Sequence, residues 1–177
     1  MDFAHAESTP HPRPLVFRTH RDELEQVVAR IDAVQRVDLR SRTAHAGGRL
    51  EQVHRWHGTQ AALPVFLRPF VSEELLVWIQ RTTWSVHAWR ADWEIEVPGL
   101  GAALECKGSN VYLEEGRGTS IEISGSFSFR PERVPELKVV PSSTVPVVER
   151  AVVSLIVPLI KQSGAAVAAY LDATHVG

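Results

Sequence analysis

Uncharged polar side chains recur at alternate positions in segments that otherwise have the pattern of half-buried strands. On the strand faces deduced below, the inward-pointing set is Ser41, Thr43, Gln52, His54, Gln80, Thr82 and Asn110. A sealed core rarely holds so many such groups, because each buried donor or acceptor needs a partner. Three interpretations stay open: the groups line a ligand cavity, they bond one another in a closed network, or the strand register is misjudged.

Aromatic side chains share this face. All five tryptophans fall on it, and Tyr112 adds a hydroxyl group. Aromatic rings bury a large area and suit apolar ligands, but they also fill ordinary cores. The predicted ligand-binding residues are Ser41, Gln52, His54, Trp56, Trp78, Gln80, Thr82, Trp93, Asn110 and Tyr112.

His54 is the titratable member of this set. It could orient a ligand through one hydrogen bond, or it could act in acid–base catalysis. Catalysis favours a histidine tuned by a second group, and no Asp or Glu falls on the deduced inner face of these central strands. His54 and His57 are three residues apart on a strand, so they point to opposite faces and cannot share a metal ion. The remaining histidines, His20 among them, are assigned to termini or turns, so neither a metal site nor a cofactor is predicted.

Composition limits the class of protein. The chain has 177 residues, which fits a single domain over 1–177. Its formal net charge of -2 argues against non-specific nucleic-acid binding, which needs many phosphate contacts. Its single cysteine, Cys106, cannot form an intramolecular disulfide and is predicted to be an inert core thiol. The N-terminus lacks a signal-peptide pattern, and no apolar run reaches the ~20 residues of a membrane span, so a cytoplasmic protein is expected.

Hydrophobic periodicity predicts seven strands and two helices. The strands are expected over 2–8, 35–43, 50–57, 76–84, 89–97, 103–113 and 119–129, and the helices over 14–32 and about 146–173, the second kinked at Pro158. Strands joined by short turns form an antiparallel sheet with one apolar face. The C-terminal helix is the only element long and apolar enough to cover that face.

Turn residues predict how the strands pair. Gly47-Gly48 is typical of a two-residue hairpin turn, which fixes the register of the strands on either side. Two glycines opposed in the last hairpin would let the sheet bend. The predicted opposite pairs are Ser41 with His54, Trp84 with Trp89, Gly108 with Gly125, and Tyr112 with Ile121.

An insert over 59–74 interrupts the strand pattern. Leu63 to Val71 is apolar and bracketed by prolines. One interpretation is an ordinary buried short helix. The other is a lid or portal over the cavity, formed by Leu63, Val65, Phe66, Leu67 and Phe70, that makes transient contact with a membrane or a donor lipid.

The order of elements resembles the START-like or Bet v 1-like helix-grip superfamily, also called SRPBCC. Three segments resemble bacterial SRPBCC proteins without an assigned function: Val16-Phe-Arg-Thr-His-Arg-Asp-Glu-Leu, Ala91-Asp-Trp-Glu-Ile-Glu and Ile156-Val-Pro-Leu-Ile. The apolar insert and the long final helix are also similar, less closely, to PRELI-type lipid-transfer domains. This resemblance implies an α+β fold in which a seven-stranded antiparallel curved sheet wraps around a long C-terminal helix.

The resemblance also implies a hydrophobic cavity between the sheet and that helix. Members of the superfamily bind lipids, sterols, polyketides or other apolar molecules, and some are cyclases, hydrolases or dehydratases. No catalytic residue is common to all of them. The predicted function is therefore binding or carriage of a hydrophobic small molecule or lipid. The alternatives are a cyclase- or dehydratase-like enzyme that uses His54, and a partner-binding module that uses the outer face of the sheet.

Overall fold

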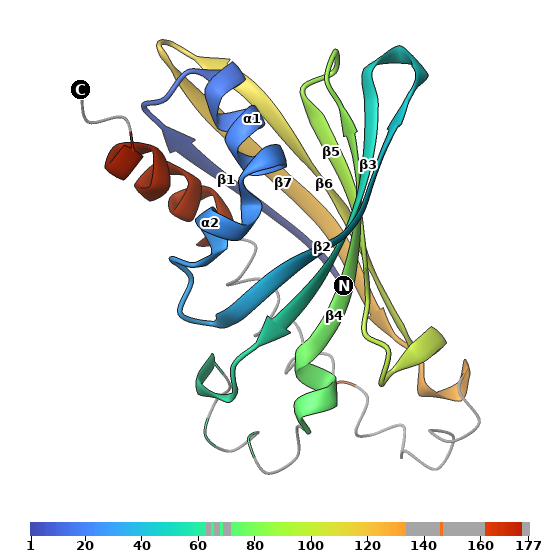
Figure 1. The fold of residues 1–177 in the computed structure, drawn as a ribbon. Helices are drawn as coiled ribbons and strands as arrows, with labels where there is room; N and C mark the ends of the chain where they lie inside the picture. Colours follow the sequence, from blue (N-terminus) through green and yellow to red (C-terminus); the bar gives the residue numbers. More distant parts are fainter. Residues whose placement is uncertain (63–64, 66–67, 69–71, 134–145, 147–161, 175–177) are drawn as a thin grey trace.

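One antiparallel sheet dominates the computed structural model, which describes residues 1–62, 65, 68, 72–133, 146 and 162–174 (Figure 1). The sheet order is β1-β7-β6-β5-β4-β3-β2, so strands joined by short turns lie side by side and β1 pairs with β7. The predicted seven-stranded helix-grip fold is confirmed. The strands are β1 Asp2–Thr9, β2 Val34–His45, β3 Arg49–Gly58, β4 Val77–Ser85, β5 Arg90–Glu96, β6 Leu104–Glu115 and β7 Gly118–Phe129.

Helices connect and cover the strands. The helix expected over 14–32 is divided at Glu23 into α1, Arg13–Asp22, and α2, Leu24–Val28, because Glu23 has a non-helical backbone with φ -124° and ψ 25°. A C-terminal helix is described over 162–174, whereas its predicted start near 146 and the kink at Pro158 lie outside the described residues. Short 3-10 turns are η1 Ala46–Gly48, η2 Gln60–Ala62, η4 Glu73–Leu76, η5 Gly101–Ala103 and η6 Pro131–Arg133.

The core lies between the helices and one face of the sheet, called the inner face below (Figure 1). Val16 and Phe17 of α1 are buried, and so are Val167 and Leu171 of helix 162–174. Their spacing gives each helix one apolar stripe. The Phe17 ring meets the Trp84 ring edge-on at 5.3 Å between centroids, so α1 packs directly on the inner face.

The pairing of β6 with β7 is the predicted one: Gly108 lies opposite Gly125, and Tyr112 lies opposite Ile121. The prediction for β4 and β5 is wrong by two residues, because Trp84 lies opposite Ala91. Trp89 belongs instead to the turn, where its φ is 50°. A shift of two residues keeps each side chain on its predicted face, since side chains in a strand alternate.

The predicted register of β2 and β3 is wrong. The turn is the three-residue η1, which pairs His45 with Arg49, and a bulge follows between Leu39 and Ser41. Ser41 therefore lies opposite Val53 and is exposed, while Leu39 takes the place opposite His54. A shift of one residue moves a side chain to the other face, so Ser41 is not part of the inner-face set.

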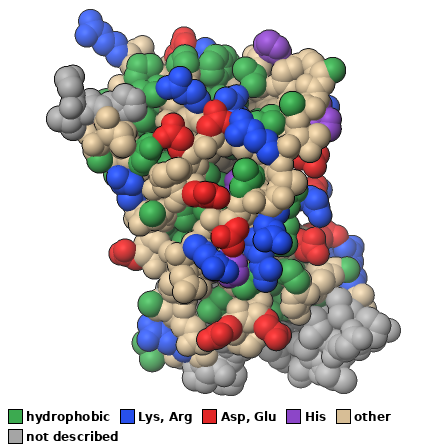
Figure 2. All heavy atoms as spheres, viewed as in Figure 1, with side chains coloured by type: hydrophobic (Ala, Val, Ile, Leu, Met, Phe, Trp, Pro, Cys, Tyr) green, Lys and Arg blue, Asp and Glu red, His purple; other side chains and the backbone are tan. Residues whose placement is uncertain are grey.

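Charges of both signs cover the surface. Figure 2 shows acidic and basic side chains interleaved on the face that it presents, in keeping with the small net charge of the chain. Among the helices that the structure describes, none is long and apolar enough to cross a membrane.

Candidate functional site

Nine of the ten residues predicted to bind ligand lie on the inner face, and Ser41 does not. The pairings bring most of them into neighbouring positions on adjacent strands. Their role in binding a ligand stays a prediction. They are Gln52, His54 and Trp56 on β3, Trp78, Gln80 and Thr82 on β4, Trp93 on β5, and Asn110 and Tyr112 on β6.

The β3–β4 ladder carries six of these residues in three consecutive inward rows. The directly opposed pairs are Gln52 with Thr82, His54 with Gln80, and Trp56 with Trp78. The rings of Trp56 and Trp78 stack with centroids 5.6 Å apart. Since inward rows are about 7 Å apart along a strand, the ladder offers aromatic area at one end and polar groups over the next two rows.

Several polar atoms on this ladder are buried without a hydrogen-bond partner among the described residues. They are Gln52 Oε1, His54 Nδ1, Trp56 Nε1 and Trp84 Nε1. Gln52 is half satisfied, because its Nε2 donates to the carbonyl oxygen of Arg21 at 2.9 Å. Each unpartnered buried group costs about 1–3 kcal/mol, so four in one area require an explanation.

His54 is uncharged near neutral pH. Burial lowers its pKa to about 4; the nearby carboxylate of Glu25 raises the pKa and the charge of Arg42 lowers it. A neutral imidazole has one donor and one acceptor nitrogen, so His54 can serve a ligand in either role. Sequence reasoning considered only carboxylates on the central strands and missed Glu25, which comes from α2.

A second group of polar side chains, from β5, β6 and α1, is joined by hydrogen bonds. Trp93 Nε1 donates to Asn110 Oδ1 at 2.9 Å, and the Tyr112 hydroxyl lies 2.7 Å from His20 Nδ1. Asn110 and Tyr112 are two residues apart on the same face of β6, and Asn110 lowers the pKa of the Tyr112 hydroxyl, against the larger effect of burial. These four residues are called the Trp93–His20 network below. Asn110 is its one member from the polar set that the sequence predicted either to line a cavity or to form a closed network.

His20 is the functional candidate that sequence reasoning missed. It had been assigned to a terminus or turn, but it lies on α1 and is buried. A signal was present, because His20 follows Val16 and Phe17 by four and three residues and precedes Leu24 by four, which is the spacing of a buried helix stripe.

Burial keeps both members of the His20–Tyr112 pair neutral. It lowers the pKa of His20 to about 4, with a smaller contribution from His54. It also raises the pKa of the Tyr112 hydroxyl well above its usual range. The hydroxyl therefore keeps its proton, and His20 Nδ1 is free to accept it in a hydrogen bond.

Two glycines make room for aromatic rings beside this network. Phe3 and Trp93 lie with centroids 6.3 Å apart, nearly parallel, on the row that also holds Gly108 and Gly125. A Cβ atom at Gly108 would collide with the Trp93 ring and with the carbonyl oxygen of Ser124. The opposed glycines, which the sequence predicted to let the sheet bend, thus also leave space for the two aromatic rings.

Glu7 connects the sheet to helix 162–174. It lies on β1 opposite Ile121, and a Cβ atom at Gly164 would overlap its carboxylate. Burial raises the pKa of Glu7 to about 7, while the nearby backbone of Gly164 and Ala165 lowers it, and Glu7 Oε1 is buried without a hydrogen-bond partner among the described residues. Glu7 is a second carboxylate on the inner side that sequence reasoning did not consider.

The predicted lid and cavity fall mostly outside the described part of the chain. Leu63, Phe66, Leu67 and Phe70 are not described, and Val65 has 73% of its surface exposed. Residues 147–161, which were expected to cover the cavity, are also not described. The lid and the cavity both stay predictions.

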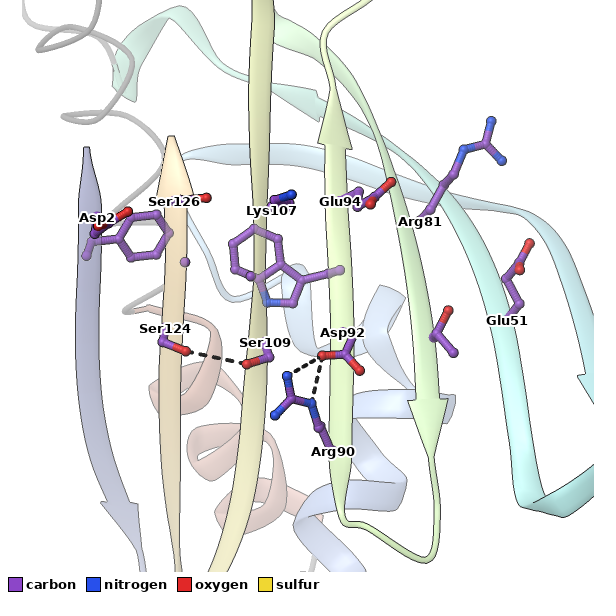
Figure 3. A pocket seen from close by; sticks show the side chains of 15 residues that line it. Asp2, Glu51, Arg81, Arg90, Asp92, Glu94, Lys107, Ser109, Ser124 and Ser126 are labelled. Carbon is purple, nitrogen blue, oxygen red and sulfur yellow. Dashed lines mark hydrogen bonds and ion pairs between the residues drawn. The ribbon is translucent and has the colours of Figure 1, made fainter. Parts of the chain in front are cut away.

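The outer face of the sheet has an open hollow of about 740 Å³ (Figure 3). Its charged side chains neutralise one another: Arg90 and Asp92 form an ion pair at 2.7 Å, and Glu94 lies between Lys107 and Arg81 on neighbouring strands. Ser109 and Ser124 lie 3.4 Å apart through their hydroxyl groups. This is the composition of a hydrated sheet face, so the apolar chemistry belongs to the inner face.

The part of the chain that the structure describes offers no metal site. No group of three or more His, Cys, Asp or Glu side chains there could hold a metal ion. Cys106 is buried, and burial raises the pKa of its thiol to about 12, so it is not a reactive thiolate.

No known family model matches the sequence, and no curated protein matches it. Solved structures do match, over nearly the whole chain. The Zhui aromatase/cyclase from a Streptomyces species has a TM-score of 0.67 at 13% identity, covering 100% of this chain and 98% of that one. The protein TTHA0849 from Thermus thermophilus has a TM-score of 0.63 at 19% identity, covering 98% and 99%. Ara h 8.0201 has a TM-score of 0.59 at 13% identity, with the same coverage.

These similarities show which fold the chain has. The chain has the helix-grip fold of the START-like or Bet v 1-like superfamily, as its order of elements predicted. Identities below 20% show the fold alone, so the function has to be argued from this chain's own side chains.

Proposed function

We propose that this protein binds or carries an apolar small molecule or lipid on the inner face of its sheet. The observation that carries the proposal is the set of unpartnered polar atoms on the β3–β4 ladder, Gln52 Oε1, His54 Nδ1, Trp56 Nε1 and Trp84 Nε1, embedded among aromatic rings. Aromatic area would bind the apolar body of a ligand, and a few fixed polar groups would orient it. A hydrogen bond to the ligand would recover part of the cost of leaving these atoms unpartnered.

The fold supports the same function. Helices pack against the inner face of the curved sheet. Gaps between such layers hold ligands in many proteins. The predicted partner is a hydrophobic molecule and not a nucleic acid, since basic and acidic side chains are balanced over the chain.

Native mass spectrometry of the freshly purified protein tests the proposal, because a tightly held apolar molecule would be found with it. Fluorescence titration with 1-anilinonaphthalene-8-sulfonate, a dye with an apolar ring system and one sulfonate group, provides a second test. We expect the dye to bind and to change the emission of the buried tryptophans. The variant Trp56→Ala should weaken dye binding, whereas Ser41→Ala, at an exposed position, should not. No bound molecule and no dye binding would contradict the proposal.

A second candidate is a cyclase- or dehydratase-like enzyme acting on an apolar substrate at the same place. The buried His20–Tyr112 pair favours it, since such a pair can hold or move a proton. Two proteins of similar fold, Zhui and the di-domain StfQ from the steffimycin biosynthetic pathway, are named as an aromatase/cyclase and an ARO/CYC. The enzyme candidate predicts that a substrate is turned over and that kcat falls a hundredfold or more in His54→Ala or in Tyr112→Phe, which removes the hydroxyl of the pair.

A further inference from the structure

We infer that the ligand is held at the end of the β3–β4 ladder farthest from α1, against Trp78 and Gln80, and that it is an uncharged molecule with a hydroxyl group. The apolar body of the ligand would lie on Trp78, and its hydroxyl group would donate to the side-chain oxygen of Gln80. This inference rests on the proposed function, because it gives the place and the polar chemistry of binding on the same inner face.

The inward side chains of β4 are not equally buried along the strand, which begins at the lower end of the sheet in Figure 1, away from α1. Trp84 and Thr82, towards α1, are buried, whereas Gln80 and Trp78 are half-buried. Ile95, opposite Gln80 on β5, is half-buried as well. A half-buried side chain on the inner face is in contact with solvent, so a small molecule has room to approach at this end.

Gln80 supplies a hydrogen-bond acceptor at the open end. Its Nε2 donates to the hydroxyl group of Thr82 at 3.1 Å, so the oxygen, on the other branch of the amide, stays available. The hydrogen bonds between described residues give this Oε1 no donor. An amide oxygen can only accept, so it fits a ligand group that has a hydrogen to donate.

His54 lies directly opposite Gln80 and favours an uncharged ligand. Its Nδ1 is buried without a partner among the described residues, and the ring is neutral because burial lowers its pKa to about 4. Neither side chain of this pair can balance the charge of a carboxylate or an ammonium group, which would be costly to place there. A hydroxyl group is uncharged, donates to Gln80 Oε1 and can still accept a hydrogen bond from a neighbour.

Trp78 supplies the apolar contact beside this acceptor. Its ring stacks on that of Trp56 at 5.6 Å between centroids with an angle of 14° between the planes, which holds it in one orientation. Gly58 leaves space for the ring, since a Cβ atom there would lie 3.1 Å from it. Trp78 precedes Gln80 by one inward row, and Ile95 lies next to Gln80 on β5. Apolar surface therefore flanks the acceptor on two sides.

Two probes test the polar contact: 2-naphthol, which has a hydroxyl group, and 2-methoxynaphthalene, which has the same rings and oxygen but no hydrogen to donate. Gln80→Met removes the amide and keeps an uncharged side chain of similar length. Isothermal titration calorimetry should show that it weakens binding of 2-naphthol about three- to tenfold, the effect of one hydrogen bond. Binding of 2-methoxynaphthalene should stay within about twofold. The control Gln35→Met, at an exposed position of β2, should change neither.

A measurement on the unmodified protein replaces this comparison if Gln80→Met does not fold. The side-chain amide signals of Gln80 in ¹H–¹⁵N spectra should shift when 2-naphthol is added and stay in place with 2-methoxynaphthalene. Trp78→Leu tests the apolar contact, and it should weaken both probes about three- to tenfold through the loss of aromatic contact.

The outcomes separate this inference from the function on which it rests. If neither the probes nor 1-anilinonaphthalene-8-sulfonate binds, the proposed function fails, and the inference fails with it. If the dye binds but the probes do not, or if Trp78→Leu leaves both probes unchanged, binding of apolar molecules stands and the inference is overturned. An equal loss of both probes in Gln80→Met also overturns it, because the oxygen of Gln80 then receives no hydrogen from the ligand.

Discussion

Two polar regions lie next to each other on the inner face, and they differ in how their hydrogen bonds are satisfied. In the Trp93–His20 network two hydrogen bonds join buried groups, one from the indole of Trp93 to Asn110 and one between Tyr112 and Nδ1 of His20. On the β3–β4 ladder four buried polar atoms have no partner among the described residues. Both regions hold buried polar groups beside aromatic rings, so the difference lies in the pairing and not in the kind of surroundings.

The contrast separates a region whose hydrogen bonds stabilise the fold from one whose unpartnered atoms would be completed by the proposed ligand. A closed network stabilises one arrangement of strands and helix, because each group would be costly to bury alone. An open set carries that cost in the free protein and recovers it only when something else binds. The cavity that the sequence predicted stays a prediction, and the hydrogen bonds observed on β5, β6 and α1 involve only Asn110 of the polar set.

The largest effect is expected from Gly108→Ala, a substitution directly beside the Trp93–His20 network. The new Cβ would collide with the carbonyl oxygen of Ser124 and with the ring of Trp93. That oxygen belongs to the backbone of the neighbouring strand and cannot move without disturbing the sheet, so we expect a loss of about 3 kcal/mol or failure to fold. Urea unfolding measures it. Gly47→Ala is the control, since nothing lies within 4 Å and only the cost of its positive φ remains, about 1–2 kcal/mol.

Tyr112→Phe should come next. It keeps the buried ring but leaves His20 Nδ1 without its partner, so stability should fall by about 1–3 kcal/mol. Thermal and urea unfolding of the variant and the unmodified protein give the difference. An unchanged stability would mean that the network is not closed through Tyr112, and the contrast between the two regions would fail.

Sequence reasoning succeeded where the local signal was sufficient. The β6–β7 hairpin has a two-residue turn between Glu115 and Gly118, and its whole register follows from that turn and the alternation of its strands. The β2–β3 hairpin contains a glycine pair too, but the turn has three residues and a bulge interrupts β2. A bulge depends on the neighbouring strands and helices, and alternation alone does not reveal it.

The sequence predicted the site only in part, again because local patterns do not reveal contacts between distant segments. Side chains on the central strands were placed on the correct face from alternation, even where the pairing was off by two residues. His20, Glu7 and Glu25 come from α1, β1 and α2, and their approach to the site depends on tertiary packing. Whether a buried polar atom has a partner depends on such contacts between distant segments, so sequence patterns could not divide the two regions.

His54→Leu tests the β3–β4 ladder. Here we expect little or no loss of stability, in contrast to Tyr112→Phe. It replaces an unpartnered polar ring by an apolar side chain of similar size, so stability should change by less than about 1 kcal/mol or rise. Binding of an apolar ligand with a polar group should weaken by about tenfold or less, the value of one hydrogen bond. Unfolding and dye titration on the same preparation measure both. A loss of stability as large as that of Tyr112→Phe would show that His54 has a structural partner.

The smallest expected effect is a change of stability with pH. It tests the contact between Glu7 and helix 162–174. Burial raises the pKa of Glu7 to about 7 from an ordinary value near 4.5, and the charge of Glu7 raises the pKa of Tyr112. In the unfolded chain Glu7 loses its proton near pH 4.5, but in the folded protein it keeps it until about pH 7. Folding is therefore favoured by this group at low pH, and its contribution declines as the pH rises from about 4.5 to 7.

His20 and His54 act in the opposite sense. Their pKa values fall to about 4 in the folded protein from 6.5, so they contribute stability above pH 6.5 that is lost as the pH falls toward 4. The Glu7 effect must therefore be isolated by comparing Glu7→Gln, a neutral side chain of the same shape, with the unmodified protein.

We expect the two proteins to be similarly stable in urea at about pH 5 and Glu7→Gln to be the more stable at about pH 8, where Glu7 is charged against the backbone of Gly164. The control Glu122→Gln lies on the exposed face of β7 and should show no such change with pH. If the curves of Glu7→Gln and the unmodified protein run parallel across this range, Glu7 is not buried against the helix. Helix 162–174 would then be held by its buried apolar side chains, among them Val167 and Leu171, and by polar contacts such as Tyr170 with Glu23 and Asp172 with His11.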